Sequence, residues 1–141
     1  MLEIELVDKN AKMPTRGTYE SAGLDFYTPE YIFIPPRSDL LVPLGLKMKF
    51  PEGWALIFKE KSGIATRKKI DIGACVVDSD YRGIVHAHLI NNSDDEVIFY
   101  QGDKVVQGIM VQVWLGEPKQ VDKLNDITER GSGGFGSTGE K

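Results

Sequence analysis

Short segments that are apolar, or that alternate apolar with polar residues, make up most of this chain. An alternation with a period of two is typical of a half-buried β-strand, because successive side chains of a strand point to opposite faces. Clusters of glycine, proline and short polar residues separate these segments, which occupy residues 2–6, 31–34, 40–50, 54–58, 85–89, 97–100 and 105–113. This rhythm of short strands and turns predicts an all-β domain.

Residues 59–69 depart from the strand pattern. They contain five basic side chains around Ser62 and Gly63, and we expect a short helix over Ile64–Lys68. Ser62 would lie at the start of this helix, where free backbone N–H groups can bind an anion. Taken alone, the segment is explained more simply by an N-cap followed by a solvated basic face.

Length and charge narrow the class of protein. The chain has 141 residues and a formal net charge of −4, which fits one domain with a real core. This charge gives no reason to expect nucleic acid or an anionic membrane as a partner, and an anionic small substrate would need a local basic cluster. The single cysteine, Cys75, excludes an internal disulfide, and no Cys/His spacing suits zinc.

The location is expected to be intracellular. No apolar run approaches the roughly 18 residues of a membrane span. The acidic residues 1–5 lack the form of a signal peptide. We therefore expect a cytoplasmic protein, or a nuclear one if the source is eukaryotic or viral.

A predicted turn at residues 76–83 joins two valines to Asp78, Asp80 and Tyr81. Asp78 and Asp80 could share a strand face, because residues two apart in a strand point the same way. For an isolated Asp-x-Asp, a solvated hairpin turn is the simpler explanation. His86 and His88 also share a strand face, but a metal site would need more ligands than this chain supplies.

Three further stretches have unusual composition. Small residues at 21–23, just before Asp25, permit a close backbone approach. Gln107 interrupts the apolar face of 105–113, so its amide must be hydrogen-bonded to the protein or to a ligand. Residues 129–139 include five glycines, which is typical of a flexible terminus. Arg130 and the isolated Phe135 suggest instead a phosphate cradle with an aromatic side chain that stacks on a base.

Together, five segments resemble the five motifs of the homotrimeric dUTPase family in order and spacing. They are Ala22–Asp25, Lys61–Gly63, Gly73–Gly83, Gly102–Gln107 and Arg130–Gly139. Each is weak alone, but all five in order make the resemblance specific, and it covers essentially the whole chain. It implies a jelly-roll-like β-barrel of the dUTPase β-clip type, with one short helix and a flexible glycine-rich tail. It also implies a homotrimer whose three active sites each use motifs from more than one subunit.

The resemblance implies an activity and a division of the chain. Residues 1–115 would form the barrel, and residues 116–141 an arm and a glycine-rich lid of the same domain. The enzyme would be a dUTP diphosphatase that hydrolyses dUTP to dUMP and pyrophosphate, which limits uracil in DNA and supplies dUMP for dTTP synthesis. Mg²⁺ would be held mainly by the substrate phosphates, with Asp25 acting through water.

The family's roles fall on the matching positions of this chain. Asp78 would orient and deprotonate the water that attacks the α-phosphorus. Tyr81 would pack on the deoxyribose, where a 2′-hydroxyl would otherwise lie. The phosphates would be held by Lys61, Ser62, Gly63, Gln107 and Arg130. The uracil edge would be read by the backbone around Cys75 and Val76, and its face would be covered by Phe135, with Gly136 as a further substrate contact.

Three positions depart from the family pattern. The family usually has arginine where this chain has Lys61, and the two differ at a forked phosphate contact. It often has glycine at the position of Cys75, whose side chain must therefore point away from the base. It usually has Ala-Gln-Leu where this chain has residues 106–108, Val-Gln-Gly, a packing change that keeps the glutamine.

Two other functions stay open at this point. The related dCTP deaminases share this kind of fold but resemble the chain less well around Asp78–Tyr81 and in the tail that carries Phe135. Release of ammonia rather than pyrophosphate would identify a deaminase. A binding or regulatory protein is the alternative from another class, and the complete set of catalytic-type residues argues against a loss of activity.

Overall fold

The computed structural model describes residues 1–124 and 127–134, and it places them in an all-β barrel with one short helix. The strands are β1 (Glu3–Leu6), β2 (Thr15–Arg16), β3 (Leu24–Tyr27), β4 (Ile32–Ile34), β5 (Asp39–Pro43), β6 (Leu46–Lys49), β7 (Trp54–Lys59), β8 (Ile70–Gly73), β9 (Val76–Val77), β10 (His86–Asn91), β11 (Val97–Phe99) and β12 (Lys104–Gln112). The helix is α1 (Ser62–Lys68). The all-β prediction is confirmed.

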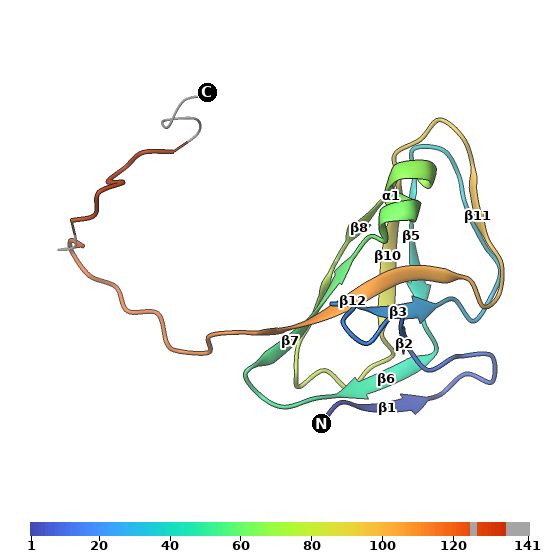
Figure 1. Cartoon of the computed structure of the whole chain (residues 1–141), viewed down its shortest axis with the longest axis horizontal. Coiled ribbons are helices and arrows are strands. Elements are labelled where there is room, and N and C mark those ends of the chain that lie inside the picture. The colour runs from blue at the N-terminus through green and yellow to red at the C-terminus, as the bar shows by residue number, and fades with distance from the viewer. Residues whose placement is uncertain (125–126, 135–141) are drawn as a thin grey trace.

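Four antiparallel sheets surround one core (Figure 1). The largest has the strand order β2-β3-β12-β7-β9, so that β12 lies at its centre between β3 and β7. A second sheet has the order β5-β10-β8, and the pairs β1-β6 and β4-β11 complete the barrel. Inward side chains alternate along β10 and meet those of the large sheet. Phe26 and Phe58 pack edge to face at the centre, with ring centroids 5.1 Å apart.

The segment 40–50 is not the single strand that its alternation predicts. It forms β5 and β6, which belong to different sheets, with a break at Leu44 and Gly45. Gly45 has φ +67°, and a Cβ atom there would lie 2.7 Å from the Cβ of Asp8. The carbonyl of Gly45 accepts hydrogen bonds from the backbone N–H groups of Val7 and Asp8. The chain therefore turns here to meet the end of β1, a long-range contact that the local pattern does not contain.

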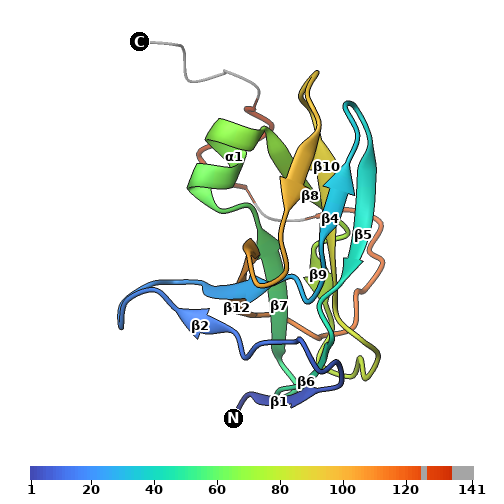
Figure 2. The ribbon, with the colours of Figure 1, turned by 90° about the vertical axis from the view of Figure 1, so that its right-hand side faces the viewer.

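The predicted helix exists and begins two residues earlier than expected, at Ser62. Lys61 is its N-cap and makes no side-chain capping bond, so the N-cap explanation of Ser62 is wrong. Ile64 anchors the helix in the core, and Lys69 ends it in a left-handed conformation. The helix lies at one end of the barrel beside β8 (Figure 2). With seven residues it is far too short to cross a bilayer, and the described residues contain no helix that could.

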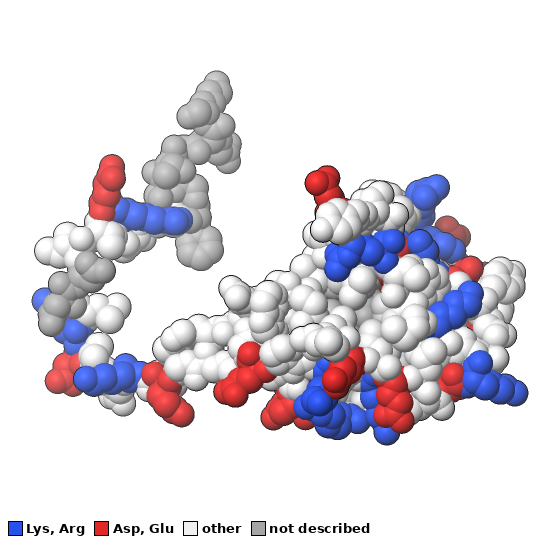
Figure 3. Space-filling model, turned by 60° about the horizontal axis from the view of Figure 1, so that its bottom comes forward, with Lys and Arg blue, Asp and Glu red and all other residues white. Residues whose placement is uncertain are grey.

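Beyond β12 the chain leaves the barrel as an extended arm, in which the described residues form no helix or strand (Figure 1). Its apolar side chains are exposed, including Trp114, Leu115, Leu124 and Ile127. On the face drawn in Figure 3, acidic and basic side chains are interspersed over the barrel. That face carries no single-sign field of the kind that a polyanionic partner would need.

Candidate active site

Two separate cavities contain most of the predicted site residues. The first, of about 190 Å³, lies at the loop that joins β9 to β10 and is called the loop cavity; its lining includes Val76, Asp78 and Tyr81. The second, of about 550 Å³, lies beside α1, and its lining includes Lys61, Ser62, Gly63 and Gln107. The two cavities have no lining residue in common.

The loop between β9 and β10, two strands that belong to different sheets, holds Tyr81 in one position. Its hydroxyl donates to the carbonyl of Ile84 at 2.9 Å, and its backbone N–H donates to the carbonyl of Asp78 at 3.2 Å. A Cβ atom at Gly83 would lie 2.3 Å from the tyrosine hydroxyl oxygen, so the ring crosses the loop where only glycine leaves room. The tyrosine is thus fixed at both ends before any ligand arrives.

Asp78 follows directly after β9 and is exposed. No hydrogen bond or ion pair joins its carboxylate to any side chain in the described part of the chain. An exposed carboxylate with free lone pairs can accept a proton from water, which is what a general base requires.

Cys75 packs its side chain against the hydrophobic core and does not line the loop cavity. Its carbonyl accepts a hydrogen bond from the N–H of Phe58 at 2.7 Å. The side chain of Val76 is exposed. Of these two positions only Val76 lines the cavity, and the cysteine side chain does not enter it.

Gln107 projects into the second cavity from β12. Its amide nitrogen donates to the carbonyl of Glu60 at 3.0 Å. A Cβ atom at Gly23 would lie 2.6 Å from the amide oxygen of Gln107. The glycine at 23 is thus explained by a close approach to this glutamine, and the protein itself satisfies one end of its amide.

Asp25 is buried behind the second cavity, opposite Gln107 in the β3–β12 register. Lys61 donates to one of its carboxylate oxygens, and Lys104 donates to the other at 2.8 Å. Burial alone would raise the pKa of Asp25, but the hydrogen bonds from Lys104 and Lys61 outweigh it and hold the pKa below its usual value. The same contact raises the pKa of Lys104.

Arg130 lies on the arm in a tight turn. Its Nε donates to the carbonyl of Gly133 at 2.9 Å, and Gly131 adopts φ +53°. Phe135 and Gly136, the other predicted tail contacts, lie outside the described residues.

Comparison with known proteins points to one family. The family model described as dUTPase matches residues 9–139. The deoxyuridine 5'-triphosphate nucleotidohydrolase of Yarrowia lipolytica is 42% identical over 140 residues, covering 98% of this chain and 88% of the relative.

The chain belongs to the dUTPase family.

Solved structures confirm the jelly-roll-like β-clip fold. The dUTPase of Staphylococcus bacteriophage 80alpha, solved with dUpNHpp, superposes with a TM-score of 0.92 at 24% identity, covering 99% of this chain and 98% of that one. The D95N mutant dUTPase of phage phi11 of S. aureus, whose structure concerns the coordination of a structural Mg(II) ion, gives 0.83 at 22% identity. It covers 89% of this chain and 99% of the phage chain.

Sequence reasoning missed two side chains that line the cavities of this dUTPase-family chain. His86 lines the loop cavity, and its Nδ1 donates to the same Ile84 carbonyl as Tyr81, at 2.8 Å. Lys104 lines the second cavity but is three residues from Gln107, a spacing that places side chains on opposite faces of a regular strand. A bulge between Lys104 and Val106 brings them to the same face, and the sequence carried no signal for it.

Proposed function

We propose that the chain is a dUTP diphosphatase, which hydrolyses dUTP to dUMP and pyrophosphate and so limits uracil in DNA while supplying dUMP for dTTP synthesis. The observation that carries this proposal is the loop cavity of a dUTPase-family chain, where an exposed, unpaired Asp78 lies beside a fixed Tyr81. The name of the Yarrowia lipolytica relative supports the same substrate.

Asp78 acts as the general base in this proposal. It accepts a proton from the attacking water, the water oxygen bonds to the α-phosphorus, and the bond to the pyrophosphate oxygen breaks in line with the attack. Tyr81, held by Ile84, fills the space beside the sugar where a ribose 2′-hydroxyl would lie. The backbone at Cys75 and Val76 reads the uracil edge, and Phe135 and Gly136 contact the base and substrate from the tail.

The phosphates bind at the second cavity. Its lining includes Lys61 and the start of α1 at Ser62 and Gly63, together with Gln107. Its other basic residues, including Arg67, give it the positive charge that a triphosphate needs. Arg130 adds a contact from the arm.

Magnesium is proposed as the cofactor. No group of three His, Cys, Asp or Glu that could hold a metal exists among the described residues, and both oxygens of Asp25 already accept lysine hydrogen bonds. Each carboxylate oxygen has a second lone pair, so Asp25 can still accept a metal-bound water. These residues therefore fit an Mg²⁺ held mainly by the substrate phosphates, where it would offset developing negative charge.

A homotrimer would join the two halves of this site. On one chain the proposed base and the proposed phosphate ligands lie in different cavities. A third hollow of about 830 Å³ is lined by apolar side chains of β7, β9 and the segment after β12, among them the partly buried Trp54 and the exposed Val76 and Leu115. A second copy packed there would cover apolar surface and could bring its phosphate cavity to the loop between β9 and β10.

The division of the chain follows from the same proposal. Residues 1–115 form the barrel, and residues 116–141 act as the arm and glycine-rich lid. In support, the buried hydrophobic residues of the described chain all lie before position 107. The intracellular location stays a prediction.

The test is the release of pyrophosphate from dUTP by the purified protein. We expect pyrophosphate and dUMP in equal amounts, with dUTP preferred to UTP and dCTP. Ammonia from dCTP without pyrophosphate would instead identify a deaminase. Sedimentation of the same sample measures the oligomeric state, and a monomer with full activity would contradict the shared site.

A further inference from the structure

The second cavity is lined by cations whose contacts differ in kind. Arg67 and Lys68 already bond to backbone carbonyls of Gly63 and Ile98. Lys61 and Lys104 instead bond to the buried carboxylate of Asp25 and remain partly open to the cavity, with side chains 28% and 44% exposed.

Each of these two ammonium groups keeps donors for a ligand. An ammonium has three N–H donors, and the bond to Asp25 uses one of them. The remaining donors of both lysines are therefore available on the cavity side. The carboxylate neutralises one of the two positive charges, so the trio still has a net positive charge.

Asp25 connects two lysines that come from distant parts of the chain. Lys61 precedes α1, Lys104 opens β12, and Asp25 lies on β3. Free lysine side chains have many rotamers, and a common partner removes that freedom from both at once. The carboxylate thus sets the spacing of two ammonium groups that come from distant segments.

We propose that Lys61 and Lys104 form a two-lysine clamp for the pyrophosphate portion of the triphosphate substrate, with Asp25 as the residue that positions both. The inference rests on the proposed dUTP hydrolysis and adds to it a phosphate ligand, Lys104. Two ammonium groups at one cavity supply several donors directed at neighbouring phosphate oxygens, as the fork of a single arginine would.

The alternative is a purely structural ion-pair bridge between β3 and β12. Such a bridge would stabilise the fold without distinguishing one nucleotide from another. The clamp acts only on ligands that carry phosphates beyond the α-phosphate. Comparing dUpNHpp, a triphosphate analogue, with dUMP therefore separates the two roles.

The experiment is calorimetric titration of wild type, Lys104→Met, Lys104→Arg and Asp25→Asn with dUpNHpp and with dUMP. Losing a charge-assisted hydrogen bond should weaken dUpNHpp binding by Lys104→Met roughly 10- to 100-fold, with dUMP affinity unchanged. Lys104→Arg should keep dUpNHpp affinity within a few-fold. Asp25→Asn should weaken dUpNHpp binding and raise KM for dUTP more than it lowers kcat.

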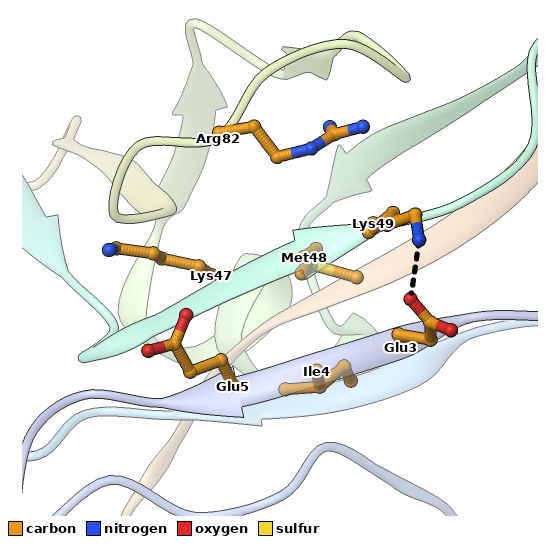
Figure 4. Close-up of a pocket in the computed structure, with 7 residues that line it drawn as sticks. All are labelled: Glu3, Ile4, Glu5, Lys47, Met48, Lys49 and Arg82. Atoms are coloured by element: carbon orange, nitrogen blue, oxygen red, sulfur yellow. Dashed lines mark ion pairs between the residues drawn. The ribbon is translucent and has the colours of Figure 1, made fainter.

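Lys49→Met is the matched control. Lys49 lies on β6, where it pairs with Glu3 at 3.1 Å in a different pocket (Figure 4). The variant removes the same charge, so unchanged dUpNHpp affinity would exclude a general effect of net charge. Thermal unfolding of every variant checks that it is folded.

Equal losses for dUpNHpp and dUMP in Lys104→Met, or no loss for either, would overturn the clamp. If the proposed function itself is wrong, wild type will release no pyrophosphate from dUTP. This result differs from the one that would overturn the clamp. In that case titration with inorganic pyrophosphate still tests the clamp. Tighter binding by wild type than by Lys104→Met would support it, and equal binding would contradict it.

Discussion

Asp25 and Asp78 are the same side chain in opposite surroundings. Asp25 is buried, and each of its oxygens accepts a hydrogen bond from a lysine, whereas Asp78 is exposed and bonds to no described side chain. The paired carboxylate has its oxygens engaged and a lowered pKa, so it is a poor proton acceptor. The unpaired carboxylate keeps its lone pairs for water. Surroundings, rather than residue type, separate a positioning carboxylate from a proposed base.

The two cavities repeat this contrast. In the loop cavity, short contacts inside the loop between β9 and β10 fix Tyr81 and leave the carboxylate of Asp78 free. In the cavity beside α1, contacts between distant segments fix the cations and leave their spare donors free. Selection of the nucleoside and binding of the phosphates thus depend on different parts of the fold, and variants can test them separately.

The largest expected effect is that of Asp78→Asn. The amide keeps the size of the side chain but cannot accept the proton, so turnover of dUTP should fall roughly 10²-fold or more. Folding and dUpNHpp affinity should stay near wild type. Asp80→Asn, which makes the same change two residues away, is the control and should stay within a few-fold. Turnover by Asp78→Asn within a few-fold of wild type would remove the base assignment.

The second largest effect on turnover is expected when the tail is removed. A chain ending at Glu129 should fold and assemble, because the core lies in the barrel, yet its turnover should collapse since the open site neither excludes water nor gains Arg130. Phe135→Ala alone should cost less, in line with stacking worth about 1–3 kcal/mol per base. Dichroism and a sizing column verify the truncated protein. Full activity from a folded, truncated trimer would mean that the tail is an idle linker.

The half of the site at the loop between β9 and β10 could be predicted from sequence because it is local. Asp78, Tyr81 and Gly83 lie within six residues, and their contacts stay inside that loop. The short strands could be predicted for the same reason, because the alternation of apolar and polar residues is a local feature of the sequence.

The sequence predicted only some of the residues that form the cavity beside α1. Lys61, Ser62 and Gly63 are adjacent, but their link to Asp25 and Lys104 depends on the β3–β12 register and on a bulge. The break at Gly45 likewise arises from contact with the turn after β1. Register and bulges are set by long-range packing, which no local pattern encodes.

A smaller effect is expected for sugar selection. Tyr81→Ala removes the ring beside the sugar, so the preference for dUTP over UTP should fall by roughly 10- to 100-fold, the scale of a lost steric contact. Tyr81→Phe is the control, because it keeps the ring and loses only the bond to Ile84. Competing turnover of dUTP and UTP measures the ratio. An unchanged ratio in Tyr81→Ala would show that another group excludes the 2′-hydroxyl.

The smallest expected effect concerns stability, and it again contrasts the two aspartates. Asp25→Asn keeps one acceptor oxygen and loses the hydrogen bond from the other lysine, but it also removes a buried charge, so the free energy of unfolding at pH 7 should fall by only about 1–2 kcal/mol. Asp78→Asn, an exposed change, should leave this free energy almost unaltered.

The pH dependence of this effect has a definite sign. Because the folded-state pKa of Asp25 lies below its ordinary value of 3.8, its contribution to stability is complete above that pH. The contribution is lost as the pH falls below 3.8 and through the folded-state pKa. Urea unfolding of wild type and Asp25→Asn between pH 7 and pH 2 should therefore give two curves that converge at low pH. A difference that stays constant over this range would mean that the lysines stabilise Asp25 by packing alone, and the contrast with Asp78 would then lose its electrostatic basis.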